Sequence, residues 1–160
     1  MSERLVIDCA RFAQSGEELN SVIPIAELSR LVGLLWTTDG TLAFSLHGTQ
    51  VTNGQAGLQL DLNGTLHLAC QRCLGEISFP LTHTRKFCVT GNGPDNVADE
   101  DPDVDFLPLI GKLDIWELIE EETLLCLPLA PTHEASTCGP RLGAQDQVER
   151  VSPFSGLRRP

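Results

Sequence analysis

Four runs of the chain alternate apolar residues with polar or small ones, and this period of two limits the possible folds more than any other feature. The runs cover residues 42–46, 58–62, 66–70 and 77–81. Because successive side chains of a β-strand point to opposite faces, each run predicts a strand with one apolar face. Together the runs predict an antiparallel meander whose apolar face must be covered by other elements.

The dipeptide Asn63-Gly64 separates the second run from the third. Asn and Gly tolerate the positive φ angles that both central residues of a type I′ turn require. We therefore expect residues 58–62 and 65–69 to form a β-hairpin with a two-residue turn.

Two helices are expected to cover the sheet. The first is predicted over 25–35 by apolar residues at helical spacing, with Pro24 in its first turn. Its stripe consists of Ile25, Leu28, Leu31, Val32 and Leu35. The second is expected to begin near Asp114, with Glu117 at capping-box spacing, and to stop before Pro128. The predicted fold class is α+β: an antiparallel sheet, meander-like or barrel-like, covered by two helices.

A length of 160 residues suits one domain, and we assign residues 1–140 to it. Glycines, prolines and many acidic residues predict a mobile, exposed acidic loop over about 91–110. Residues 141–160 have no periodic apolar face, so we expect a flexible C-terminal tail.

The net charge of −11 is unevenly distributed. Residues 95–122, called the acidic belt below, contain eleven acidic residues and one lysine, which leaves the rest of the chain nearly neutral. Two interpretations of the belt are open: a solvated surface, or a docking surface for a basic partner. The charge balance excludes a generically basic nucleic-acid binder.

Composition excludes several other classes of protein. Six cysteines are too few for a disulfide scaffold, the apolar runs are too short to span a bilayer, and no signal-peptide pattern opens the chain. We therefore expect a cytoplasmic protein with no membrane partner. No Ser-His-Asp arrangement, P-loop or dinucleotide-binding motif is present, so we expect no enzymatic activity.

The motif Cys70-Gln71-Arg72-Cys73 is the sharpest local signal, because a C-x-x-C after a strand can direct two thiolates to one metal ion. His133 and Cys138 are spaced as a second ligand pair, so the predicted cofactor is zinc in a Cys₃His site. Two alternatives remain open. The cysteines can be structural free thiols, or a redox pair, although no βαβ pattern places them at a helix N-terminus.

The remaining cysteines and histidines are assigned to structural positions. Three cysteines lie within apolar patterns and are predicted core thiols: Cys9, Cys88 and Cys126. Three histidines on the polar side of strands are predicted surface residues: His47, His67 and His83. Glu122 falls within the apolar stripe of the second helix, so we expect it to form a salt bridge at the edge of the core.

Three segments, taken in order, resemble the large ribosomal RNA subunit accumulation protein family, the YceD-like proteins. The first runs from Leu68 through Cys73 into the strand 77–81, and the second reads DIWELIEEETLLCLPLAPTH over residues 114–133. The third is Ser152-Pro153-Phe154 with the basic residues that follow it. The acidic linker between the first two segments also fits, so the resemblance extends over residues 68–160, more than half of the chain.

The resemblance implies a non-enzymatic factor for accumulation or processing of large-subunit (23S) ribosomal RNA. Its implied partner is precursor ribosomal RNA or an assembly intermediate of the ribosome. Some relatives carry a second C-x-x-C after the helix, which would complete a four-cysteine zinc ribbon. This chain offers His133 and Cys138 in that region instead.

Two modes of action remain open under this resemblance. In the first, the protein contacts precursor RNA through basic residues while the acidic belt faces away. The candidate contact residues are Arg72, Arg85, Lys86, Arg158 and Arg159. In the second, the protein is an adaptor whose acidic belt docks on a basic ribosomal protein or assembly factor, without touching RNA.

Overall fold

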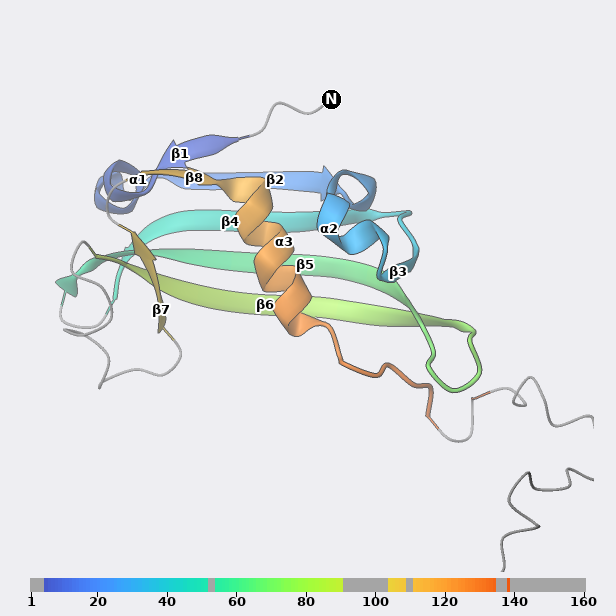
Figure 1. Ribbon diagram of the computed structural model, residues 1–160. Coiled ribbons are helices and arrows are strands. Elements are labelled where there is room, and N and C mark those ends of the chain that lie inside the picture. Colours follow the sequence, from blue (N-terminus) through green and yellow to red (C-terminus); the bar gives the residue numbers. More distant parts are fainter. Residues whose placement is uncertain (1–4, 52–53, 91–103, 109–110, 135–137, 139–160) are drawn as a thin grey trace, which may run out of the picture.

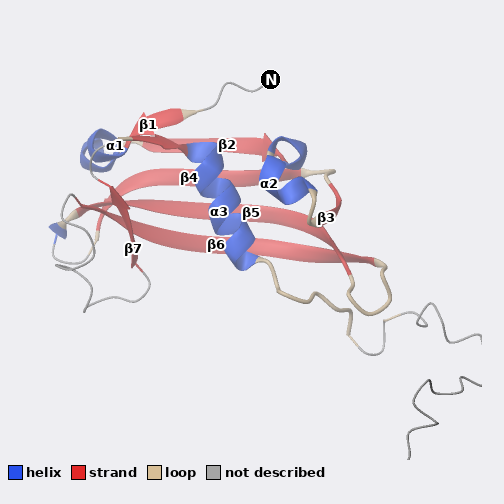
Figure 2. Cartoon of the chain, in the orientation of Figure 1, coloured by secondary structure: helices blue, strands red, loops and turns tan. Residues whose placement is uncertain are grey.

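The structure is a computed structural model that describes residues 5–51, 54–90, 104–108, 111–134 and 138. In chain order its elements are β1 (Val6–Asp8), α1 (Cys9–Ser15), β2 (Glu18–Pro24), η1 (Ile25–Glu27), α2 (Ser29–Val32), β3 (Leu35–Thr37), β4 (Thr41–Gln50), β5 (Ala56–Ala69), β6 (Glu76–Thr90), β7 (Val104–Pro108), β8 (Lys112–Asp114) and α3 (Ile115–Cys126). Figure 2 shows long strands with helix α3 lying across them. The predicted α+β class is confirmed.

The main sheet has the strand order β2-β4-β5-β6-β7, and β3 pairs in addition with β5 (Figure 1). The pairs β4–β5 and β5–β6 are antiparallel, as the meander predicts, whereas β7 runs parallel to β6. The described sheet is open, with β2 and β7 at its edges, so it does not close into a barrel. β1 and β8 form a separate antiparallel pair, which brings the start of α3 beside the N-terminal strand.

The predicted hairpin at Asn63-Gly64 is wrong, because both residues lie in the middle of the continuous strand β5. Gly64 pairs with Leu42 on one side and with Leu81 on the other. A Cβ at Gly64 would lie 2.9 Å from Leu42 Cδ1 and 3.0 Å from the carbonyl oxygen of Thr41. The glycine therefore permits a close approach between strands and not a turn.

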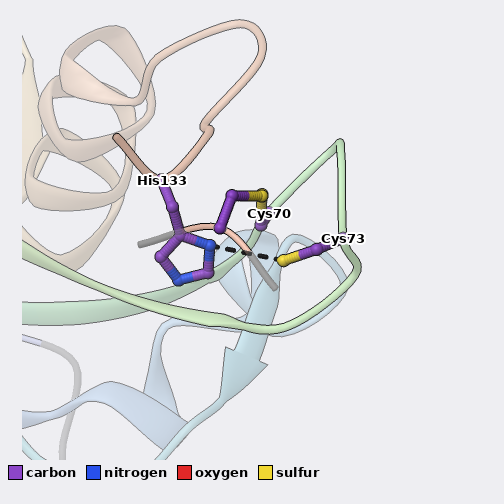
Figure 3. A group of neighbouring side chains, drawn as sticks. Cys70, Cys73 and His133 are labelled. Carbon is purple, nitrogen blue, oxygen red and sulfur yellow. Dashed lines mark hydrogen bonds between the residues drawn. The ribbon is translucent and has the colours of Figure 1, made fainter. Parts of the chain in front are cut away.

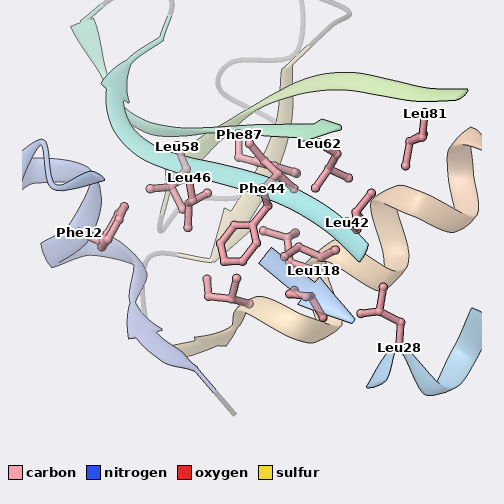
Figure 4. Packing of buried hydrophobic residues seen from close by; sticks show 14 of the residues in the cluster. Phe12, Leu28, Leu42, Phe44, Leu46, Leu58, Leu62, Leu81, Phe87 and Leu118 are labelled. Atoms are coloured by element: carbon pink, nitrogen blue, oxygen red, sulfur yellow. The ribbon is translucent and has the colours of Figure 1, made fainter. Parts of the chain in front are cut away.

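Helix α3 forms as predicted and covers the apolar face of the sheet. The Asp114 carboxylate accepts hydrogen bonds from the backbone amides of Trp116 and Glu117, which caps the first turn. The Trp116 ring makes an edge-to-face contact with Phe44 of β4, with 6.2 Å between the ring centroids. Figure 4 shows Phe44 among the leucines of β4 and β5 in the core below the helix.

The single helix predicted over 25–35 is wrong in its extent. The chain forms the 3₁₀ turn η1, the one-turn helix α2, and then strand β3, which begins at Leu35. Leu28, with φ −86° and ψ 82°, interrupts the helical path between η1 and α2. Ile25, Leu28 and Leu31 of the predicted stripe are nevertheless buried, so the apolar spacing identified core residues correctly.

Strand β7 lies inside the segment predicted as an acidic loop over 91–110. Its residue Asp105 accepts a hydrogen bond of 2.6 Å from Arg85 Nε of β6, which joins the two parallel strands. The other parts of that segment, residues 91–103 and 109–110, lie outside the described residues, as does the predicted tail 141–160. None of the described helices is long and apolar enough to cross a membrane.

Candidate metal centre

The loop between β5 and β6 supplies two of the predicted ligands, Cys70 and Cys73. Two backbone hydrogen bonds close this loop, from Leu74 N to the Cys70 carbonyl (2.9 Å) and from Cys70 N to the Gly75 carbonyl (2.8 Å). Leu74 adopts a left-handed conformation, with φ of 60°, which is uncommon for a residue with a side chain. The tight turn brings both cysteines to one end of the sheet (Figure 3).

The segment after α3 supplies the other two predicted ligands, His133 and Cys138. Helix α3 ends at Cys126, and the chain then passes along the β5–β6 loop. The Gln71 amide donates to the Pro131 carbonyl at 2.8 Å, which fixes the segment against the loop two residues before His133.

All four predicted ligands lie around a common centre. Their ligand atoms lie within 4.8 Å of one another, although Cys70 and Cys138 are far apart in the sequence. The two sulfurs of Cys70 and Cys138 are 3.9 Å apart, and Cys73 Sγ lies 3.3 Å from His133 Nδ1. A tetrahedral zinc ion with Zn–S bonds of about 2.3 Å separates its sulfur ligands by about 3.8 Å. The arrangement therefore fits a Cys₃His zinc site.

The histidine ring is oriented by the chain itself. Its Nε2–H group donates to the Glu76 carbonyl at 2.8 Å, so Nδ1 keeps the lone pair that faces Cys73. Metal-binding histidines commonly donate their second ring nitrogen to a carbonyl or carboxylate in this way. This hydrogen bond is an independent observation that the donor set suits a metal ion.

Arg72 closes one side of the cluster. Its Nε donates to Cys138 Sγ at 2.9 Å, and its terminal nitrogen donates to the carbonyls of His133 (3.1 Å) and Glu134 (3.3 Å). Three thiolates and one Zn²⁺ leave one net negative charge, which the guanidinium would neutralise. With zinc bound, the three thiolates, the zinc ion and the Arg72 guanidinium would together carry no net charge.

Local hydrogen bonds favour thiolates at the C-x-x-C motif. Burial alone would raise the pKa of Cys70, but hydrogen bonds from the backbone of Cys73, His133 and Arg72 outweigh it and lower the pKa to about 5. A hydrogen bond from the backbone of Gly75 is the main reason that the pKa of Cys73 is lowered. Thiolates are the form of cysteine that binds metals.

The second ligand pair has the opposite tendency. The hydrogen bond to the Glu76 carbonyl raises the pKa of His133. Burial raises the pKa of Cys138, and the hydrogen bond from Arg72 only partly offsets this increase. Protons therefore compete with a metal ion more strongly at these two positions than at Cys70 and Cys73.

The three candidate RNA-contact residues that the structure describes are not gathered into one site. Arg72 faces the cysteine cluster, Arg85 is paired with Asp105 of β7, and Lys86 is exposed. The two tail residues, Arg158 and Arg159, lie outside the described residues.

Several predictions about individual residues can be compared with the structure. Cys9 and Cys88 are buried as predicted, whereas Cys126 is only half-buried. Glu122 is buried and lies 3.1 Å from Nε2 of His83, so the predicted partner at the core edge exists. His83 itself was predicted to be a surface residue, but it is half-buried beneath α3.

The sequence pattern did not identify the groups that support the cluster. The carbonyls of Gly75, Glu76 and Pro131 and the side chain of Arg72 hold the ligands in place. Any residue supplies a backbone carbonyl, so no sequence signal could have identified the three carbonyl groups.

The sequence profile of the family "Large ribosomal RNA subunit accumulation protein YceD" matches residues 58–159. A protein of Haemophilus influenzae with the same name is 26% identical, over 98% of this chain and 89% of its own length. No solved structure matches the chain.

Proposed function

Because this chain belongs to the large ribosomal RNA subunit accumulation protein family, YceD, we propose that it supports the accumulation of large-subunit (23S) ribosomal RNA in the cytoplasm. The observation that carries this proposal is the family match over residues 58–159. The matched region includes β5 from Leu58 onward, β6, α3 and all four residues of the candidate metal centre.

We further propose that the centre holds a structural zinc ion and that the protein is not an enzyme. Four protein ligands fill a tetrahedral site and leave no open position for water or substrate. Zinc in such a site stabilises the fold by cross-linking, and catalytic zinc sites keep one position free. Here the ion would join the β5–β6 loop to the segment after α3.

The proposed mode of action is a protein contact with an assembly intermediate. Among the described residues, acidic side chains outnumber basic ones by more than two to one. Two of the candidate RNA-contact residues, Arg72 and Arg85, donate to groups of the protein itself. An adaptor that docks on a basic ribosomal protein fits this distribution better than direct binding of phosphates.

Deletion of the gene and measurement of the ratio of 23S to 16S ribosomal RNA test the function. We expect the ratio to fall, and we expect the intact gene to restore it. A Cys73→Ser variant should restore it less well, whereas Cys126→Ser, which changes a cysteine outside the cluster, should restore it fully. An unchanged ratio after deletion would contradict the proposed function.

A pull-down with and without nuclease tests the mode of action. Ribosomal proteins that remain bound after nuclease treatment support the adaptor. Binding that disappears with nuclease, and that falls linearly on a log–log plot against salt, would instead support direct contact with precursor RNA.

A further inference from the structure

Two hollows lie along helix α3. The first, called the apolar hollow, has a volume of about 270 Å³ and is lined mainly by leucines, including Leu34, Leu124, Leu127 and Leu129. The second, called the acidic hollow, has a volume of about 290 Å³ and contains three carboxylates, those of Glu27, Glu117 and Glu120. Each is large enough to receive side chains of a partner.

Both hollows border the same face of α3. Glu117 and Glu120 line the acidic hollow, and Leu124 and Leu127 line the apolar one. Glu117, Glu120 and Leu124 are separated by three, four and seven residues, so they fall on one side of the helix, and Leu127 follows directly after its last residue. With a rise of 1.5 Å per residue, Glu117 and Leu124 are about 10 Å apart along the helix.

The opposite walls also follow one another along the chain. Residues of η1 and α2, among them Glu27 and Arg30, line the acidic hollow, and Leu34, just after α2, lines the apolar hollow. Figure 1 shows α2 beside α3 in this part of the molecule. The two hollows therefore form a surface between two elements, acidic at one end and apolar at the other.

The apolar end exposes large side chains to water. Leu129 is fully exposed and Leu34 is 55% exposed, although both line the same hollow. Leu125, on the neighbouring face of α3, is 70% exposed. Contiguous exposed apolar residues of this kind mark sites of protein contact more often than scattered single ones do.

The acidic end determines the charge of the occupant. Glu27 and Glu117 are exposed, whereas Glu120 is buried and accepts hydrogen bonds from Arg30 N (3.0 Å) and Ser29 Oγ (3.4 Å). Arg30 is the one basic residue among those lining this hollow. The excess of carboxylates repels phosphate groups and attracts Lys and Arg side chains.

We propose that these two hollows form a docking surface for a Lys- and Arg-rich segment of a ribosomal protein. Apolar side chains of that segment would occupy the apolar hollow, and its basic side chains would meet Glu27 and Glu117 about 10 Å away. The identity of the partner as a ribosomal protein rests on the proposed function. The location and chemistry of the surface rest on the residues above.

Photo-crosslinking of the full chain tests this surface. A benzophenone amino acid replaces Leu129, and in a matched control it replaces Val22, which is 55% exposed on β2, away from both hollows. The probe is the total protein of large ribosomal subunits, extracted and freed of RNA by nuclease. We expect at least tenfold more adduct at position 129 than at position 22, and the crosslinked peptide should be rich in Lys and Arg.

Charge variants test the acidic end. Glu117→Gln in the position-129 protein should lower the adduct yield at least threefold, whereas Glu17→Gln, beside α1, should leave it unchanged. Equal yields at positions 129 and 22 would overturn the proposal, as would an unchanged yield with Glu117→Gln. Crosslinks to the chain's own tail, to a second copy of it, or to 23S RNA in a parallel reaction would also overturn it.

The experiments distinguish failure of the docking surface from failure of the proposed function in 23S RNA accumulation. If deletion lowers the 23S ratio but position 129 captures nothing, only the docking surface is wrong. If position 129 captures a basic segment but the 23S ratio is unchanged by deletion, only the proposed function is wrong.

Discussion

At the scale of single residues, several polar and small residues have roles that depend on neighbours distant in the sequence. Arg72 lies between the two ligands of a C-x-x-C motif, and its guanidinium reaches Cys138 and the backbone of His133. Hydrogen bonds within the candidate metal centre therefore account for the position of this arginine without RNA. Gly64, in contrast, contributes by what it lacks, because its hydrogen leaves room for the neighbouring strand.

The substitution Gly64→Ala should destabilise the protein by about 1–3 kcal/mol, because an added methyl group at this half-buried, closely packed position displaces its neighbours. The added Cβ would meet a backbone oxygen of Thr41 at 3.0 Å, which cannot move without disturbing the sheet. Denaturant unfolding of both proteins measures the difference.

Gly33→Ala provides the matched control for this substitution. A Cβ at Gly33 would meet no atom within 4 Å, and its φ of −77° suits any residue. We expect its stability to change by no more than about 1 kcal/mol, with a small gain from reduced freedom of the unfolded chain. Equal losses for both variants would contradict the proposed close approach at Gly64.

At the scale of elements, α3 organises one side of the molecule. Ile115, Leu118 and Ile119 are buried in the core, Glu122 meets His83 of β6, and Glu120 caps α2 through Arg30 N. The main-chain amides of α2 have no cap from the preceding residue, so a carboxylate 90 positions later supplies one. Buried acidic residues of the acidic belt thus have structural roles.

Loss of the α3 cap should cost about 0.5–2 kcal/mol of stability, the usual range for such a residue. In Asp114→Ala the amides of Trp116 and Glu117 lose their acceptor. Asp114→Asn keeps an oxygen in the same place and should lose clearly less. Thermal unfolding followed by circular dichroism compares the two variants, and an equal loss in both would show that charge alone, and not capping, stabilises this helix end.

At the scale of the whole molecule, the candidate metal centre joins two parts of the chain that are far apart in the sequence. The ligands from the β5–β6 loop and those after α3 are about 60 positions apart in the sequence. Gln71 and Pro131, which are hydrogen-bonded to each other, also line the apolar hollow. The centre therefore fixes one wall of the proposed docking surface.

Removal of zinc by a chelator should lower the melting temperature by about 5–11 °C. This range corresponds to about 2.7 kcal/mol of binding free energy at a hundredfold excess of zinc over its dissociation constant. Hydrogen exchange should accelerate first in residues 70–76 and 131–134, because metal binding and local folding are coupled.

Cysteine variants separate this effect from unspecific action of the chelator. Cys73→Ser should melt lower from the start and should no longer respond to the chelator. Cys126→Ser should respond as the unmodified protein does. The zinc site would be contradicted if protein purified without added zinc contained no metal and if the chelator did not change its melting temperature. The four residues would then be three free thiols and a histidine.

The sequence by itself determined the features that depend on local pattern. Alternation identified the three long strands β4, β5 and β6, and Asp114 identified the start of α3. The spacing of the four candidate ligands identified the residues that meet, which are Cys70, Cys73, His133 and Cys138. These predictions succeeded because a period of two, a cap and a ligand spacing act within a few residues, or require particular side chains.

The tertiary structure decided what depends on distant neighbours. Asn63-Gly64 has turn chemistry, but pairing with β4 and β6 on both sides keeps β5 extended. The stripe over 25–35 has helical spacing, but pairing of Leu35 with Leu68 draws its end into the sheet as β3. In both places the many hydrogen bonds and buried side chains of the sheet outweigh a local preference of about 1 kcal/mol or less. Because these contacts come from distant parts of the chain, no local sequence pattern could reveal them.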